Sequence, residues 1–186
     1  MSWRDLLSWA TAITGVRAVI AVVITWVPLP WRLPLYLFAL LTDILDGTVA
    51  RATRRQTRAG AVLDGWVDKT LHVNLAWAMA VEDRFPDWYL LCWFSREILQ
   101  APLVPILTRR FRLAQGPEPS TNLAGRITAG MLAISMTMVL AGYDAEPWTW
   151  LTGACGLWSA AWYWRDYFLP WWRAGHERGA TGPPCP

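Results

Sequence analysis

Apolar segments of similar length, separated by short polar stretches, organise this chain of 186 residues. Six of them can be delimited, at residues 7–29, 31–53, 60–81, 87–108, 121–142 and 147–169. Each approaches the length of about 20 residues that an α-helix needs to cross the hydrocarbon layer of a bilayer. Pro28, Pro30, Pro86, an arginine-rich stretch at 51–58 and the sequences QGPEPS and YDAEP fall between the segments, where such residues end helices. The pattern predicts an all-α integral membrane protein with six transmembrane helices.

The amino-acid composition agrees with this prediction and indicates which kinds of partner the chain can bind. Hydrophobic residues make up 54% of the chain, and its fifteen tryptophans suit membrane–water interfaces, where the ring N–H group stays hydrated. The net charge is +3, and the basic residues are sixteen arginines and one lysine. Because most arginines lie between apolar segments, they fit lipid headgroups or phosphate ligands better than a nucleic acid. We therefore expect a lipid bilayer as the environment and no nucleic-acid partner.

The arginines in the loops and near the ends of the predicted spans are distributed unequally between the two sides of the membrane. If the N-terminus is cytoplasmic, only Arg32 and Arg84 fall on the outer side. Eleven fall on the cytoplasmic side: Arg4, Arg51, Arg54, Arg55, Arg58, Arg109, Arg110, Arg112, Arg165, Arg173 and Arg178. Short cytoplasmic loops of membrane proteins carry such an excess of Arg and Lys. The distribution predicts a multi-pass protein with a cytoplasmic N-terminus. We expect it in a bacterial inner (cytoplasmic) membrane.

The two ends of the chain differ from the part between them. The first residues, MSWRDLL, can form a short interfacial helix that lies along the membrane surface. The last residues are rich in Gly, Pro and small side chains, which favours disorder. We therefore expect one membrane domain over residues 1–170 and a disordered tail over residues 171–186.

Four aspartates interrupt the apolar pattern at the facing ends of the second and third segments. Asp43 and Asp46 are three residues apart, and Asp64 and Asp68 are four apart, so each pair shares one helix face. Four carboxylates at membrane depth are costly unless they share protons or bind divalent cations. The plainer interpretation is a set of boundary residues, with Asp43 paired to Arg51 and the others solvated. Two cations close together are a common way to bind phosphates, so phosphate chemistry on a cytoplasm-facing site is the functional prediction.

Around these aspartates the sequence reads D-x2-D-G-x2-A-R-x8-G-x3-D-x3-D, with every fixed position filled. These positions are Asp43, Asp46, Gly47, Ala50, Arg51, Gly60, Asp64 and Asp68. The chain thereby resembles the CDP-alcohol phosphatidyltransferases, which carry this signature. The resemblance extends over about residues 5–170 and includes a T-x2-R sequence at Thr14 and Arg17.

The resemblance implies a six-helix membrane enzyme, usually a homodimer, that uses two divalent ions, Mg2+ or Mn2+. By resemblance, Asp43, Asp46, Asp64 and Asp68 bind the metals, and Asp68 also acts as the general base. The positions implied to line the CDP site are Gly47, Ala50, Arg51 and Gly60. The expected donor is CDP-diacylglycerol. A polar alcohol takes over its phosphatidyl group, and CMP leaves.

The acceptor alcohol depends on residues outside the signature. Lys69, the sequence SREIL around Arg96 and the sequence AGRIT around Arg126 resemble features of phosphatidylglycerophosphate synthases, which implies sn-glycerol-3-phosphate as acceptor. The sequence departs from that pattern in three ways: Gly65 replaces a proline, Val104 replaces an arginine that would help to hold the acceptor phosphate, and the fifth segment lacks the expected Lys-Thr…Gln pattern. The arginines that can take over this role are Arg109, Arg110 and Arg126.

Several alternatives stay open at this point. The same chemistry can serve another acceptor, such as an inositol phosphate, phosphatidylglycerol in cardiolipin synthesis, or a different polar alcohol. An intramembrane prenyltransferase also uses aspartate-rich motifs, and a small transporter can use aspartates as titrating sites, but neither needs the complete signature. His72 lies one turn beyond Asp68 and can touch the site, although a packed helix histidine is the simpler interpretation.

Overall fold

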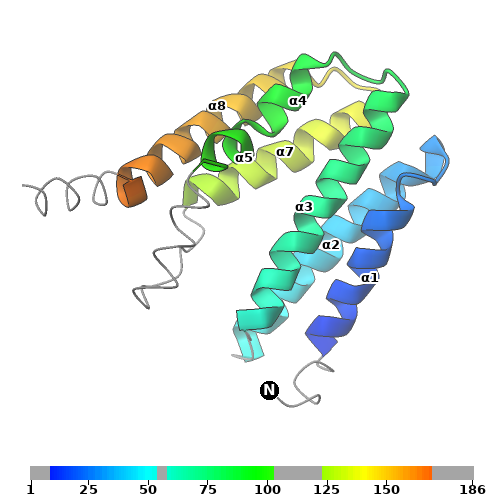
Figure 1. The fold of residues 1–186 in the computed structure, drawn as a ribbon. Coiled ribbons are helices and arrows are strands. Elements are labelled where there is room, and N and C mark those ends of the chain that lie inside the picture. Colours follow the sequence, from blue (N-terminus) through cyan, green and yellow to red (C-terminus); the bar gives the residue numbers. More distant parts are fainter. Residues whose placement is uncertain (1–8, 54–57, 103–122, 169–186) are drawn as a thin grey trace, which may run out of the picture. The chain divides into compact units, whose positions relative to one another are not determined.

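The computed structural model describes residues 9–53, 58–102 and 123–168, and within them the side chains of residues 15–45, 65–102 and 123–166. Every regular element in these residues is helical. Seven are α-helices and one is a π-helix: α1 (Trp9–Val23), α2 (Leu29–Thr53), α3 (Arg58–Val81), α4 (Trp88–Trp93), α5 (Ser95–Gln100), α7 (Leu123–Ala141), α8 (Glu146–Tyr163) and η1 (Trp164–Phe168). Figure 1 shows their course. The all-α prediction is confirmed.

The described helices correspond to the six predicted segments, but the fourth segment does not form one continuous helix. The fourth segment is broken at Phe94, where φ is −105° and ψ is 12°, so that α4 and α5 are separate short helices. Phe94 is neither proline nor glycine, and its N–H still donates to the Leu90 carbonyl at 3.0 Å. The end of this segment, residues 103–108, lies outside the described residues.

The prediction that Pro30 lies between helices was wrong. Helix α2 begins at Leu29, so Pro30 occupies its first turn, where a missing N–H costs nothing because that group has no helical partner. Pro86 and the YDA part of YDAEP do separate helices, whereas Glu146 and Pro147 begin α8. The predicted interfacial helix at the N-terminus and the predicted disordered tail lie outside the described residues.

One of the described helices, α7, is both long and apolar enough to cross a membrane, with a mean hydropathy of 1.6 over 18 residues. Six spans are therefore not confirmed by this criterion. Helices α2 and α3 carry aspartates and arginines, and α8 is rich in Trp, Thr, Ser and Gly, all of which lower hydropathy.

The chain divides into two compact units. The first contains residues 1–87 and 136–145, and the second contains residues 88–135 and 146–186. In the first unit, α1 packs against both α2 and α3, as Figure 1 shows. The fully buried side chains of this unit include Ile24, Tyr36 and Leu75. The Asn74 side-chain amide donates to the Ala21 carbonyl at 2.6 Å, which ties α3 to α1.

The second unit is built on α8, against which α4 and α5 pack. Trp93 is fully buried, and its indole N–H donates to the Ser135 hydroxyl at 2.9 Å. The Ser135 and Thr149 hydroxyls are 2.7 Å apart, so one polar chain links α4, α7 and α8. Small residues on α8 let the helices approach closely, above all Gly156, which faces Ser95.

Candidate active site

The signature aspartates lie on two continuous helices of the first unit. Asp43 and Asp46 belong to the C-terminal half of α2, and Asp64 and Asp68 to the N-terminal half of α3. Both pairs lie within helices, so the prediction that three- and four-residue spacing puts each pair on one helix face stays open at Asp46 and Asp64. The side chains of six signature residues lie outside the described set: Asp46, Gly47, Ala50, Arg51, Gly60 and Asp64. The roles given to these six stay predictions, and the geometry of the site rests on Asp43 and Asp68.

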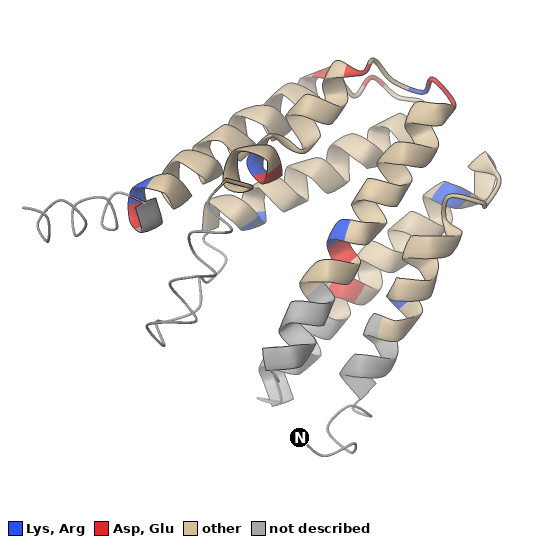
Figure 2. Ribbon diagram, in the orientation of Figure 1, with Lys and Arg blue, Asp and Glu red and all other residues tan. Residues whose placement is uncertain are grey.

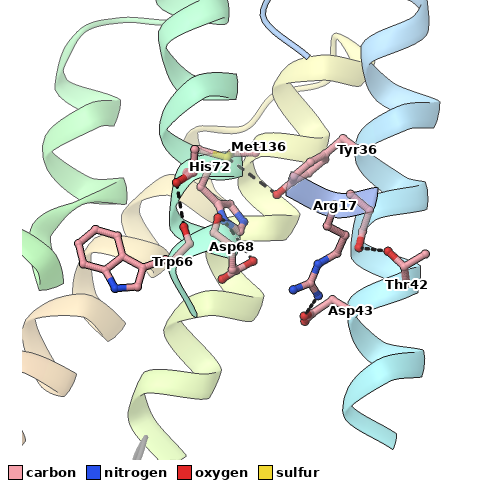
Figure 3. Close-up of polar contacts among 10 residues, drawn as sticks. Arg17, Tyr36, Thr42, Asp43, Trp66, Asp68, His72 and Met136 are labelled. Carbon is pink, nitrogen blue, oxygen red and sulfur yellow. Dashed lines mark hydrogen bonds and ion pairs between the residues drawn. The ribbon is translucent and has the colours of Figure 1, made fainter. Parts of the chain in front are cut away.

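Asp43 forms an ion pair with Arg17 of α1, whose guanidinium Nη1 is directed at the carboxylate Oδ1 (Figure 3). The Arg17 side chain is 2% exposed, whereas that of Asp43 is 44% exposed. Arg17 therefore reaches the carboxylate from inside the unit, and part of Asp43 stays open. The sequence suggested Arg51 as a partner for Asp43 and gave Arg17 no role in the site. The signal that could have found it is an arginine in an apolar segment, which requires a nearby anion.

Asp68 lies beside a buried histidine one turn further along α3. The His72 Nδ1 is 2.8 Å from the Asp68 backbone carbonyl oxygen and 3.5 Å from the carboxylate Oδ1. The Asp68 side chain is 39% exposed, so the carboxylate is accessible from outside the unit. The His72 ring packs edge-to-face against Tyr36 of α2, with ring centroids 5.9 Å apart. These contacts join the two aspartate-bearing helices close to the carboxylate (Figure 3).

The donor set suits a divalent cation by its chemistry. Carboxylate oxygens are the ligands that Mg2+ and Mn2+ prefer, and both described aspartates have accessible side chains. Among the side chains that the structure describes, no group of three or more His, Cys, Asp or Glu residues lies together. Two of the four predicted ligands, Asp46 and Asp64, are outside that set. The metal site therefore stays a prediction, and the carboxylates of Asp43 and Asp68 have the chemistry that it requires.

The residues predicted to hold the acceptor belong to another part of the chain. Arg109 and Arg110 lie outside the described residues. Arg126 is exposed on the first turn of α7, in the second unit. In the same unit the half-buried Arg96 guanidinium lies against Gly125, and its Nη1 is 3.4 Å from the Gly125 carbonyl oxygen. In Figure 2 the charged positions stand out against helices that are otherwise mostly uncharged.

A family model described as CDP-alcohol phosphatidyltransferase matches residues 7–164. The chain belongs to the CDP-alcohol phosphatidyltransferase family. This match confirms the resemblance drawn from the signature, and it covers all the described helices except η1, of which it reaches only the first residue.

Named relatives fit this membership. Proteins named "Putative cardiolipin synthase" from Mycobacterium bovis and Mycobacterium tuberculosis are 28% identical to the chain over 126 residues, which is 68% of this chain and 58% of theirs. The "Bifunctional IPC transferase and DIPP synthase" of Thermococcus kodakarensis is 32% identical over 106 residues, which is 55% of this chain and 23% of that protein. The matched part thus spans a little over half the length of the mycobacterial relatives.

Proposed function

We propose that this chain transfers a phosphatidyl group from CDP-diacylglycerol to the hydroxyl of a polar alcohol and releases CMP. Family membership supports the reaction type, because these proteins are transferases of substituted phosphate groups. The observation that carries the proposal is the complete signature on α2 and α3, with accessible carboxylates at Asp43 and Asp68.

In the proposed reaction, the acceptor hydroxyl oxygen forms a bond to the lipid-side phosphorus of the donor. The bond from that phosphorus to the CMP oxygen breaks, and CMP leaves with the electron pair. Asp68 takes the hydroxyl proton, a role that suits a carboxylate that is accessible at the edge of the unit. Gly47, Ala50, Arg51 and Gly60 would line the nucleotide site on the adjoining turns of α2 and α3.

Divalent ions, two per site, would be held by Asp43, Asp46, Asp64 and Asp68, and when bound they would neutralise the pyrophosphate charge. The buried Arg17 guanidinium stays paired with the Asp43 carboxylate and thereby limits the directions in which this carboxylate can point. The buried position of the guanidinium suits such a fixed contact.

For the acceptor we propose sn-glycerol-3-phosphate, which gives phosphatidylglycerophosphate. Arg109, Arg110 and Arg126 are the candidates for its phosphate. Phosphatidylglycerol is the second candidate acceptor, because the mycobacterial relatives carry the name of a cardiolipin synthase. An inositol phosphate is the third candidate, one of the alternatives that the sequence left open.

We further propose that residues 1–170 form one membrane domain with six spans, a cytoplasm-facing site and a homodimeric assembly in a bacterial inner membrane. Large apolar side chains on the outside of α1 and α3 support contact with lipid. They include Val19 of α1 and Trp66 and Trp77 of α3, each more than half exposed.

The proposal is tested with the purified full chain in detergent, supplied with CDP-diacylglycerol, Mn2+ or Mg2+, and one acceptor at a time. CMP release that requires both the metal and the acceptor is the expected result. Asp87→Asn, which changes an exposed carboxylate outside the signature, serves as the control and should keep the wild-type rate. Folded protein that releases no CMP with any acceptor would refute the transferase proposal. Release with phosphatidylglycerol or an inositol phosphate alone would change the acceptor only.

A further inference from the structure

His72 is a buried polar residue to which the proposed reaction assigns no role. Its Nδ1 lies 2.8 Å from the backbone carbonyl oxygen of Asp68. A carbonyl oxygen only accepts hydrogen bonds, so Nδ1 must carry the proton and donate it. In the neutral ring, Nε2 then holds the lone pair. The helix backbone thus selects one tautomer of His72.

The surroundings of His72 keep the ring in this orientation. The residue is 5% exposed, and its ring meets the face or edge of the fully buried Tyr36 ring at an interplanar angle of 89°. The Tyr36 hydroxyl lies 3.9 Å from the Met136 sulfur, so the tyrosine is itself enclosed. A ring held by α2 on one side and by its own helix on the other has little freedom to turn away from Asp68.

The second ring nitrogen of His72, Nε2, makes a histidine at this buried position energetically costly. The Nε2 atom is buried and has no hydrogen-bond partner among the described residues. Burying an unpaired polar atom costs free energy, so an apolar side chain of similar size would fill this position more cheaply. Within the described residues, the polar contacts of His72 all run through Nδ1, toward Asp68.

We infer that His72 is a positioning residue for Asp68. This inference rests on the proposed function, in which Asp68 accepts the proton of the acceptor alcohol. The Nδ1–H group lies 3.5 Å from the carboxylate Oδ1, which is longer than a hydrogen bond but close enough for its positive end to attract that oxygen. His72 thereby holds one carboxylate oxygen toward the interior, and the second oxygen is left for the substrate and the metal. Such a contact tightens when the substrate is bound.

Three substitutions separate this role from simple packing. His72→Asn keeps a nitrogen donor on Cγ, where Nδ1 is attached, and His72→Gln moves the amide one bond further out, toward the Nε2 position. His72→Leu keeps much of the volume and removes both nitrogens. Leu75→Val is the packing control, because Leu75 is fully buried on the same helix and one turn away from His72.

The measurement is CMP release by the full chain in detergent, with kcat and KM for CDP-diacylglycerol determined separately. We expect His72→Leu and His72→Gln to lower kcat by about 10- to 100-fold, as the loss of a residue that orients a site ligand does, with KM unchanged. His72→Asn should recover most of kcat, and Leu75→Val should keep it. Equal kcat for the leucine variant and the wild type, equal loss in the asparagine and leucine variants, or an effect on KM alone would overturn the inference. If the leucine variant does not fold, the comparison of Asn with Gln decides.

A second measurement does not depend on turnover. The chain has two histidines, His72 and His176, so protein with 15N-labelled histidine gives few signals, and the His176→Ala variant assigns them. The inference requires the Nδ1–H tautomer at His72, and the Nε2–H tautomer would refute it. A wild-type protein that shows the Nδ1–H tautomer but releases no CMP would refute the proposed function. Normal CMP release by His72→Leu would instead refute only the role of His72.

Discussion

The guanidinium of Arg17 and the carboxylate of Asp43 form an ion pair between α1 and α2 whose two partners differ strongly in exposure. Arg17 is 2% exposed and Asp43 is 44% exposed. Removing the carboxylate leaves a buried cation without this partner, whereas removing the guanidinium leaves an anion that water can reach. The two losses should therefore have different costs.

We predict that Asp43→Ala lowers the free energy of unfolding by about 2 kcal/mol, because the buried Arg17 loses one of its contacts and keeps the rest. Arg17→Met, which keeps most of the side-chain volume, should cost about 1 kcal/mol, since Asp43 can hydrate. The double variant should resemble Arg17→Met alone, because no buried cation is then left. Thermal or denaturant unfolding of the three variants in detergent measures this. Equal costs for the single variants, or additive costs in the double variant, would contradict the prediction.

The sequence was sufficient to place the aspartates on two helices, but not to identify the side chains that contact Asp43 and Asp68. Asp43 and Asp68 are recognisable because each has a second aspartate three or four residues away in the same segment. Arg17 and His72 act through contacts that depend on how α1, α2 and α3 pack, and spacing along one helix does not encode that packing. The break at Phe94 was missed for a similar reason, since no proline or glycine marks it.

Asp68→Asn tests the proposed general base. The amide is isosteric with the carboxylate but cannot take a proton from the acceptor hydroxyl. We expect kcat to fall by about 10²- to 10⁴-fold, the range for loss of general-base catalysis. Binding of CDP-diacylglycerol, measured without an acceptor, should largely survive. A variant with the wild-type rate would show that Asp68 is not the base, and a variant that loses donor binding would assign it to binding alone.

Gly125 and Gly130 offer a matched pair on α7. A Cβ atom at Gly125 would lie 2.9 Å from the Arg96 guanidinium, whereas one at Gly130 would meet nothing within 4 Å. Alanine is a better helix former than glycine, so Gly130→Ala should raise the free energy of unfolding by about 0.5–1 kcal/mol. Gly125→Ala should raise the free energy of unfolding less, because the new methyl group displaces the Arg96 guanidinium from the Gly125 carbonyl.

The same pair of substitutions in an Arg96→Ala background provides the control. Without the guanidinium, Gly125→Ala should stabilise the protein more than it does in the wild-type background, and the difference between the two positions should shrink. Unfolding of all variants in one detergent gives the comparison. If the difference between the two positions persists without Arg96, its cause is not the guanidinium.

Gly156 of α8 faces Ser95 of α5 at the closest approach among the described glycines. A Cβ atom at Gly156 would lie 2.2 Å from the Ser95 hydroxyl oxygen and 3.4 Å from the Arg96 backbone nitrogen. The hydroxyl can turn aside only by giving up its hydrogen bond to the Cys92 carbonyl, which is 3.0 Å long. Gly156→Ala should therefore lower the free energy of unfolding by about 1–3 kcal/mol, the usual cost of overpacking.

Removing the hydroxyl should relieve this clash. In a Ser95→Ala background the nearest atoms to the new Cβ are the Ser95 Cβ at 3.5 Å and the backbone nitrogen at 3.4 Å, both ordinary contacts. Gly156→Ala should then cost little, and its higher helix propensity should offset part of the remaining cost. Thermal unfolding of the two single variants and the double variant measures the coupling between the positions. Additive effects would mean that α5 and α8 adjust to the extra methyl group by moving apart, and that the serine hydroxyl does not limit their approach.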